Sequence, residues 1–238
     1  MLNIVGLTKK FGEKVAVDNL TLEVKAGQIC AFIGHNGAGK TTTLKAIAGI
    51  INFDAGEIKV DGVDVIKNPM EAKSRLAYLP DNPELYEHLK GIGYLNFIAD
   101  VFKIDEKTRK ERIETYAKRL EIFDDLSLPI SSYSHGMKQK LALVSALIHK
   151  PKLLLLDEPF VGLDPTASHQ FKLIMQELAD EGSAIFYSTH VLEVAEKICS
   201  HVAIIKQGKL VAAGTMEEVK GMKSLESLFL ELEDEKHS

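Results

Sequence analysis

Apolar positions in the first third of the chain recur in short runs that have the spacing of β-strands. Between residues 58 and 65, apolar residues alternate on either side of Asp61-Gly62, a dipeptide that favours a type I′ hairpin turn. These runs predict an antiparallel β-subdomain beside the main core. Besides this hairpin, the predicted strands lie at residues 2–7, 15–17, 20–24 and 29–33.

From residue 136 onward, helical and strand patterns alternate. Leu153–Leu156 is a continuous apolar run of strand length, as in a parallel strand that is buried on both faces. Asp164-Pro165 supplies an N-cap and a first-turn proline, and Thr215 begins a capping box. This alternation predicts an α/β fold with a mainly parallel sheet. The predicted helices are 136–150, 165–180, 191–199 and a short one after 215, and the further predicted strands are 184–188, 202–205 and 209–212.

Residues 83–130 interrupt the alternation with a stretch of helical composition. Its residues 105–112 are mixed in charge, and apolar residues follow them at helical spacing. The simplest interpretation of these charges is the solvated face of a helix. The segment is therefore predicted to be a helical insertion, which forms a helical subdomain at about residues 83–150 together with the helix that follows it.

Gly34–Thr41 reads GHNGAGKT and fits the pattern G-x-x-x-x-G-K-[ST]. It lies between a predicted strand and a predicted helix at 42–50, which is the context in which this pattern binds phosphate. Glycines let successive backbone N–H groups point toward an anion, and the helix N-terminus adds the positive end of its dipole. Lys40 is expected to reach the β- and γ-phosphates, and the Thr41 hydroxyl to hold Mg²⁺. The residues expected around the phosphates are Gly34, His35, Asn36, Gly37, Ala38, Gly39, Lys40, Thr41 and Thr42.

The side chain of His35 has no assigned role, because its position in the pattern is variable. The loop by itself does not distinguish a kinase from a GTPase, a helicase or a transport motor.

Two carboxylates follow the apolar run that ends at residue 156. The buried strand is expected to deliver Asp157 to the magnesium shell near Thr41. Glu158 is then placed to accept a proton from an attacking water. The alternative is an ordinary surface turn after a core strand. Two acids at this point, in a chain that already has a phosphate loop, favour the catalytic interpretation.

Composition narrows the class of protein. The 238 residues carry a net charge of −5, which argues against a general attraction to nucleic acid, so no direct nucleic-acid partner is expected. Cys30 and Cys199 lack metal-ligand spacing and are predicted to be buried free thiols in a reducing compartment. The sequence shows no signal-peptide pattern and no apolar run long enough to span a membrane. A role at a membrane would require docking on a chain that spans it.

Three short motifs extend the pattern beyond the phosphate loop. Residues 132–140, SYSHGMKQK, open a helix, Gly162-Leu163-Asp164 follows the paired acids, and Ser188-Thr189-His190 ends a later strand. In order and approximate spacing they resemble the signature (commonly LSGGQ), the D-loop and the switch histidine of the ATP-binding-cassette (ABC) family. The resemblance covers essentially the whole chain. Phe11 falls where the family places an aromatic residue that stacks on adenine, although it could equally be a core or turn aromatic.

The resemblance implies the P-loop NTPase core of ABC ATPases. The ABC ATPase domain is then expected at residues 1–221, and a short C-terminal helix with a charged tail at 222–238. Two such domains, identical or different, would face each other head to tail and enclose two ATP molecules with Mg²⁺. Hydrolysis would remove the γ-phosphate that joins them, so that the pair opens.

The resemblance also assigns roles within each composite site. The P-loop of one subunit would meet Ser134 and Gly136 of the other, and Asp164 of the D-loop is expected among the nucleotide-binding residues. Catalysis would rest on Glu158, on Lys40 and on His190, which would contact the γ-phosphate and help to position water. For Ser134, the alternative role is simply to cap its helix.

The chain departs from the family pattern at two places. In the family, the residue after the strand that precedes the helical insertion is usually glutamine. Here Ala77-Tyr78-Leu79-Pro80 is followed by Asp81 instead. We expect Asp81 to bind Mg²⁺ through a carboxylate oxygen, and Asn82 to supply an amide only if the loop shifts by one residue. The signature has tyrosine, histidine and methionine at 133, 135 and 137, but it keeps the serine and the second glycine expected to touch phosphate. We therefore expect the site to be catalytically active rather than degenerate.

The leading hypothesis is the ATPase subunit of a membrane transporter whose permease is a separate chain. The protein would then be cytoplasmic and peripheral on the inner face of the cell membrane. The YLP segment and the signature variant resemble bacterial exporters of the drug, antibiotic or bacteriocin-resistance type. The alternative is a non-transport ABC switch on the ribosome or nucleic acid. A small-molecule kinase would leave the signature and His190 unexplained.

Overall fold

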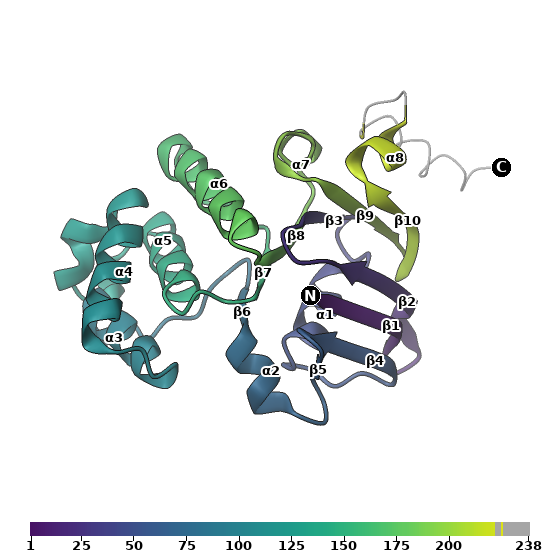
Figure 1. Cartoon of the computed structure of the whole chain (residues 1–238), viewed down its shortest axis with the longest axis horizontal. Helices are drawn as coiled ribbons and strands as arrows, with labels where there is room; N and C mark the ends of the chain where they lie inside the picture. The colour runs from purple at the N-terminus through teal and green to yellow at the C-terminus, as the bar shows by residue number, and fades with distance from the viewer. Residues whose placement is uncertain (222–224, 226–238) are drawn as a thin grey trace.

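The computed structural model describes residues 1–221 and 225 of the chain. Within them a six-stranded sheet forms the centre of the molecule (Figure 1). Its strands run parallel, except that the edge strand Lys209–Thr215 pairs antiparallel with its neighbour His201–Lys206. The predicted mainly parallel α/β fold is therefore confirmed. The strand order is β10 (Lys209–Thr215), β9 (His201–Lys206), β3 (Ile29–Ile33), β8 (Ala184–Thr189), β7 (Leu153–Asp157) and β6 (Leu76–Leu79).

The predicted antiparallel subdomain is a second sheet, which has four strands in the described chain. Asp61 and Gly62 both have positive φ, 48° and 79°, as the predicted type I′ turn requires. Met1 O accepts a hydrogen bond from the Asp61 amide at 2.6 Å, which joins the turn to the start of the chain. The strand order is β2 (Lys14–Val24), β1 (Leu2–Phe11), β4 (Ala55–Val60) and β5 (Val63–Asp64).

Helices cover both faces of the central sheet. One face packs against α5 (His135–Leu147), α6 (Pro165–Asp180) and α7 (Leu192–Ile198). The other packs against α1 (Lys40–Ile47), α2 (Pro69–Arg75) and the antiparallel sheet. Because both faces are covered, the central strands carry near-continuous apolar runs, and Leu153–Leu156 is fully buried.

The helical subdomain projects from one edge of the sheet, beside β6 (Figure 1). It consists of α3 (Gly91–Val101), α4 (Glu106–Arg119), two short 3₁₀ turns (Phe123–Ser127 and Ile130–Ser132) and α5. The charged stretch at 105–112 begins α4 and is mostly exposed, as predicted. No helix in the part of the chain described here is both long and apolar enough to cross a bilayer.

Two elements differ from the sequence pattern. The predicted strands 15–17 and 20–24 are one strand, β2, because Asn19 has a φ of 49° and interrupts the alternation within it. Helix α2 has no counterpart among the predicted elements, since only Ala72 of its residues is buried and it has no apolar stripe. α8 (Met216–Lys220) begins with the predicted capping box, whereas the predicted tail at 222–238 lies outside the described residues, Leu225 excepted.

Candidate nucleotide-binding site

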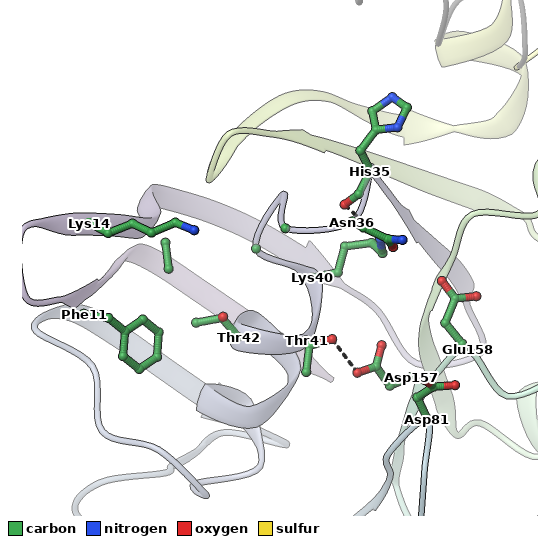
Figure 2. Close-up of a pocket in the computed structure, with 13 residues that line it drawn as sticks. Phe11, Lys14, His35, Asn36, Lys40, Thr41, Thr42, Asp81, Asp157 and Glu158 are labelled. Carbon is green, nitrogen blue, oxygen red and sulfur yellow. Dashed lines mark hydrogen bonds between the residues drawn. The ribbon is translucent and has the colours of Figure 1, made fainter.

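A cavity of about 330 Å³ opens at the carboxyl ends of β3, β6 and β7. Ligands commonly bind at this edge of a parallel sheet. Three carboxylates gather at one end of the cavity, and Phe11 lies at the opposite end (Figure 2). The lining residues are Phe11, Lys14, Ala16, His35, Asn36, Gly37, Gly39, Lys40, Thr41, Thr42, Asp81, Asp157 and Glu158.

The glycines of the loop serve two different purposes. A Cβ atom on Gly39 would lie 2.5 Å from Ala16 O, and one on Gly34 would lie 2.5 Å from Ile205 O, so both positions require close backbone packing. Gly37 has a φ of 81°, and a Cβ atom there would meet nothing within 4 Å, so the backbone borders open space. The loop is thus held tightly at its ends and open in the middle, where an anion would sit.

Lys40 begins α1 and points back into the loop. Its ammonium donates hydrogen bonds to the carbonyl oxygens of Gly34 and, at 3.2 Å, of His35. Burial lowers the pKa of the Lys40 ammonium, and the carboxylates of Glu158 and Asp157 act in the opposite direction. The N-cap residue of α1 is Gly39, which has no side chain to cap the helix. A buried ammonium and uncapped N–H groups together make the loop a site for an anion.

Thr41 and Asp157 form the second part of the site. The Thr41 hydroxyl donates to Asp157 Oδ2 at 2.6 Å, which joins the phosphate loop to the end of β7 (Figure 2). The Ser188 hydroxyl donates to the other carboxylate oxygen, Oδ1. Both oxygens of a nearly buried carboxylate are therefore oriented before any ligand binds. A hydroxyl beside an ionised carboxylate is the oxygen donor set that Mg²⁺ prefers, and the cation usually keeps several waters.

Glu158 is held in an uncommon backbone conformation. Its φ is 49°, a left-handed value that costs energy for a residue other than glycine and that occurs often at functional sites. His190, in the turn after β8, donates from Nδ1 to Glu158 Oε1 at 2.9 Å. The Glu158 side chain is 14% exposed, whereas that of His190 is 59% exposed. The carboxylate thus reaches the cavity with a histidine fixed beside it.

Asp81 and Phe11 take positions that suit their expected roles. Asp81 lies near Asp157 at the acidic end of the cavity (Figure 2). Asn82 is not among the described residues that line the cavity. Phe11 is 53% exposed at the end of β1, and the Lys9 ammonium lies over its ring, 4.9 Å from the centroid. A stacking ligand would therefore use the other face of the ring.

The signature and D-loop residues lie together, away from this cavity. Ser134 caps α5 by accepting a hydrogen bond from the Met137 amide at 3.2 Å. A Cβ atom on Gly136 would lie 2.7 Å from Gly162 O. Asp164 caps α6, and its other carboxylate oxygen pairs with Lys140 at 2.6 Å. Within the described chain, Ser134, Gly136 and Asp164 do not line the cavity, so a single copy does not bring them to the P-loop.

Three residues of the site have no role that the sequence pattern assigns. Lys14 and Ala16 line the cavity from β2, a strand whose pattern indicates only packing. Ser188 orients Asp157 because β7 and β8 pair in register, with Asp157 opposite Ser188. The sequence contains Ser188 in a recognisable motif, but strand pairing is what places it beside the acid.

The fold and the site together define a P-loop nucleotide-binding protein. The oxygen donors, the anion loop and the exposed aromatic ring fit a nucleoside triphosphate with a divalent cation. A cation held there by Thr41 and Asp157 would neutralise phosphate charge.

Comparisons with known proteins identify the family. The ABC transporter family model matches residues 17–161. The chain is 33% identical over 224 residues to the ABC transporter ATP-binding protein NatA of Bacillus subtilis (strain 168), covering 92% of this chain and 91% of that protein. It is 32% identical over 240 residues to the ABC-type transporter ATP-binding protein EcsA of the same organism, covering 99% and 97%. A solved ATP-binding subunit of an ABC transporter superposes with a TM-score of 0.94 at 32% identity, covering 98% of this chain and 99% of the other.

The chain therefore belongs to the ABC transporter family, as an ATP-binding subunit. Membership supports nucleotide binding and ATP hydrolysis, and it confirms the resemblance drawn from the motifs.

Proposed function

We propose that this chain hydrolyses ATP to power a transporter whose membrane-spanning part is a separate chain, and that transport is export. The observation that carries the proposal is the cavity itself. It holds an anion loop, an oriented carboxylate and Glu158 at one end, and an exposed aromatic ring at the other. His190 is not among the described residues that line it but contacts the Glu158 carboxylate. The relatives are ATP-binding proteins of transporters, which supports the same function.

ATP is expected to lie with its adenine against Phe11 and its phosphates in the Gly34–Thr42 loop. Lys40 would exchange its two carbonyl partners for β- and γ-phosphate oxygens. Mg²⁺ would be held by Thr41 and Asp157, with Asp81 contributing a third oxygen. Ser188 keeps the Asp157 carboxylate oriented toward the cation.

The hydrolytic step needs a base within reach of a water at the γ-phosphate. Glu158 is placed for that role because it faces the cavity beside Asp157 (Figure 2). It would accept the proton of the attacking water. His190 donates to the same carboxylate and would position the water and the γ-phosphate. Lys40 would stabilise the charge that develops on the transferred phosphoryl group.

If Ser134, Gly136 and Asp164 serve the nucleotide, the site of a single copy would be incomplete, because within the described chain they do not line the cavity. A head-to-tail pair of ATPase domains would bring these residues of one subunit to the P-loop of the other. The N-terminus of α5, with the Ser134 hydroxyl, is suited to a phosphate. Whether the pair contains two copies or two different subunits, ATP would join its halves and hydrolysis would separate them.

The helical subdomain offers a surface for the membrane partner. A groove of about 280 Å³ lies between β6 and this subdomain, next to a cluster of exposed aromatic side chains. Tyr86 is 51% exposed and contacts the ring of Phe97, itself 44% exposed, with centroids 5.8 Å apart. Exposed aromatic residues are enriched at protein interfaces. Cytoplasmic helices of a permease are the expected occupant, which would place this chain in the cytoplasm on the inner face of the membrane.

The test is to search the neighbouring genes for one that encodes a multi-spanning protein and to co-express that protein with this chain. Detergent-solubilised complexes should co-purify and hydrolyse ATP, and should move substrate when reconstituted in vesicles. Retention of the ATPase on ribosomes or DNA in a salt-sensitive manner, without a membrane partner, would refute the transport function.

A further inference from the structure

The loop from Glu158 to Asp164 is fixed at both ends and turns tightly between them. At its start, the Glu158 amide donates to Ser188 O at 3.2 Å. Two successive turns follow, in which Val161 N donates to Glu158 O at 3.1 Å and Leu163 N to Phe160 O at 3.3 Å. At its end, Asp164 caps α6. A displacement at Asp164 would therefore be passed along a short, hydrogen-bonded segment to Glu158.

The first turn of α5 packs directly on this loop. Gly136 approaches the Gly162 carbonyl so closely that a Cβ atom would lie 2.7 Å away. A Cβ atom on Gly162 would in turn lie 2.7 Å from His135 Cδ2, so the imidazole covers that position. Gly136 has no room for a side chain, and the φ of 80° at Gly162 disfavours one there. The two segments fit against each other as one packed unit.

One turn further along α5, an ion pair joins this helix to the end of the Glu158–Asp164 loop. Lys140 Nζ lies 2.6 Å from Asp164 Oδ2, and the Lys140 side chain is only 11% exposed. The Ala167 amide donates to the other oxygen, Oδ1, at 2.8 Å. The hydrogen bond from the Ala167 amide and, to a lesser extent, the one from Lys140 hold the pKa of the Asp164 carboxyl below its usual value. Both oxygens of Asp164 are thus occupied within the chain.

We propose that Lys140 is a positioning residue for catalysis, because its ion pair with Asp164 holds the Glu158–Asp164 loop and the signature end of α5 as one rigid unit. The proposal rests on the proposed function. In a head-to-tail pair, Ser134 would serve the partner's nucleotide and Glu158 the nucleotide of its own subunit. Lys140 would then link the two active sites of the pair, so that closure of one orders the base of the other.

The experiment compares steady-state ATP hydrolysis by wild type, Lys140→Met and Lys140→Arg in the full chain with its partner subunits. Lys140→Met should lower kcat about tenfold, since small misplacements of a catalytic group have effects of this size or larger. KM should stay within about twofold, because Lys140 is not among the described residues that line the nucleotide cavity. Lys140→Arg keeps the positive charge and should restore kcat.

A double-mutant cycle separates the ion pair from helix capping. Asn is as good an N-cap as Asp, so Asp164→Asn removes the charge and keeps the cap of α6. Its kcat should fall at least as far as in Lys140→Met, because Asp164 is also expected at the partner's P-loop, and the double variant should be no worse than Asp164→Asn alone. Lys150→Met is the matched control, since it removes the Lys150–Glu181 pair at 3.0 Å near the other end of α5 and should leave kcat unchanged.

Three results would overturn the positioning role: unchanged kcat in Lys140→Met, failure of Lys140→Arg to restore it, or additive losses in the double variant. A lower unfolding temperature with unchanged kcat would mean that the pair is only structural. Absence of ATP hydrolysis in the wild-type complex would instead count against the proposed function, so the two failures are distinguishable.

Discussion

Replacement of Glu158 by glutamine tests the proposed base most directly. The two side chains have the same shape, but an amide cannot accept the proton of the attacking water. The tight turns around residue 158 use backbone groups, and its left-handed φ of 49° is equally costly for either residue. Among the described residues the side chain is hydrogen-bonded to His190, at 2.9 Å, and a glutamine oxygen can still accept that bond. The free energy of unfolding should therefore change by no more than about 1 kcal/mol, the net value of a typical uncharged hydrogen bond.

The effect on turnover should be far larger. A positioned general base contributes a factor of about 10²–10⁴, or roughly 3–5 kcal/mol of transition-state stabilisation. Phosphate release measures kcat, a fluorescent ATP analogue measures binding, and chemical denaturation measures stability. Binding and stability should stay near wild type while kcat falls by that factor.

Glu193→Gln is the matched control. Glu193 is an exposed acid in α7, a few residues beyond His190, so the same substitution there should leave kcat unchanged. Near wild-type hydrolysis in Glu158→Gln would refute a general-base role for Glu158. A large loss of stability or of ATP binding in that variant would instead mean that the Glu158 carboxylate supports the fold or nucleotide binding, contrary to the expectation that only kcat changes.

Three further predictions concern the loop, the metal and the helical subdomain. Lys40→Ala, made in a Glu158→Gln background, should abolish ATP-dependent dimer closure on size-exclusion chromatography, and a dimer that still forms would contradict this. Asp81→Ala should raise the Mg²⁺ concentration needed for half-maximal ATP turnover while Asn82→Ala should not; impairment of the Asn82 variant alone would reverse the assignment. Burial lowers the pKa of His149 from 6.5 to about 4. As the pH falls, the unfolded state therefore takes up a proton at this residue before the folded state does, and the free energy of unfolding decreases below about pH 6.5. This contribution is about 2 kcal/mol between pH 7 and pH 5, and in His149→Gln that part of the pH dependence of unfolding should be absent.

Strand and helix assignments followed well from the sequence where side-chain pattern and local turn chemistry agreed. The Asp61-Gly62 hairpin turn and the capping box at Thr215 are local, so neighbouring residues suffice to specify them. Where contacts with distant parts of the chain decide which residues are buried, the pattern of apolar residues predicted the element less well. Helix α2 buries one residue, and the left-handed Asn19 divides the apolar alternation of a single strand into two.

For the site, the sequence by itself determined which motifs are present and so which chemistry to expect. The order Gly34–Thr41, Asp157-Glu158 and His190 predicts an anion loop, a metal-binding acid, a base and its companion, because each motif is a short contiguous segment. Family membership followed from the same motifs. The roles of Asp81, Phe11, Ser134 and the other individual residues stay predictions.

Only the tertiary structure decided which of these groups meet. The in-register pairing of β7 with β8 places Ser188 against Asp157, and the packing of α5 on the D-loop gives Lys140 its ion pair with Asp164. The same packing leaves Ser134 outside the cavity that the P-loop lines. Such contacts join residues distant in sequence, and side-chain spacing along a chain carries no information about which distant elements will touch.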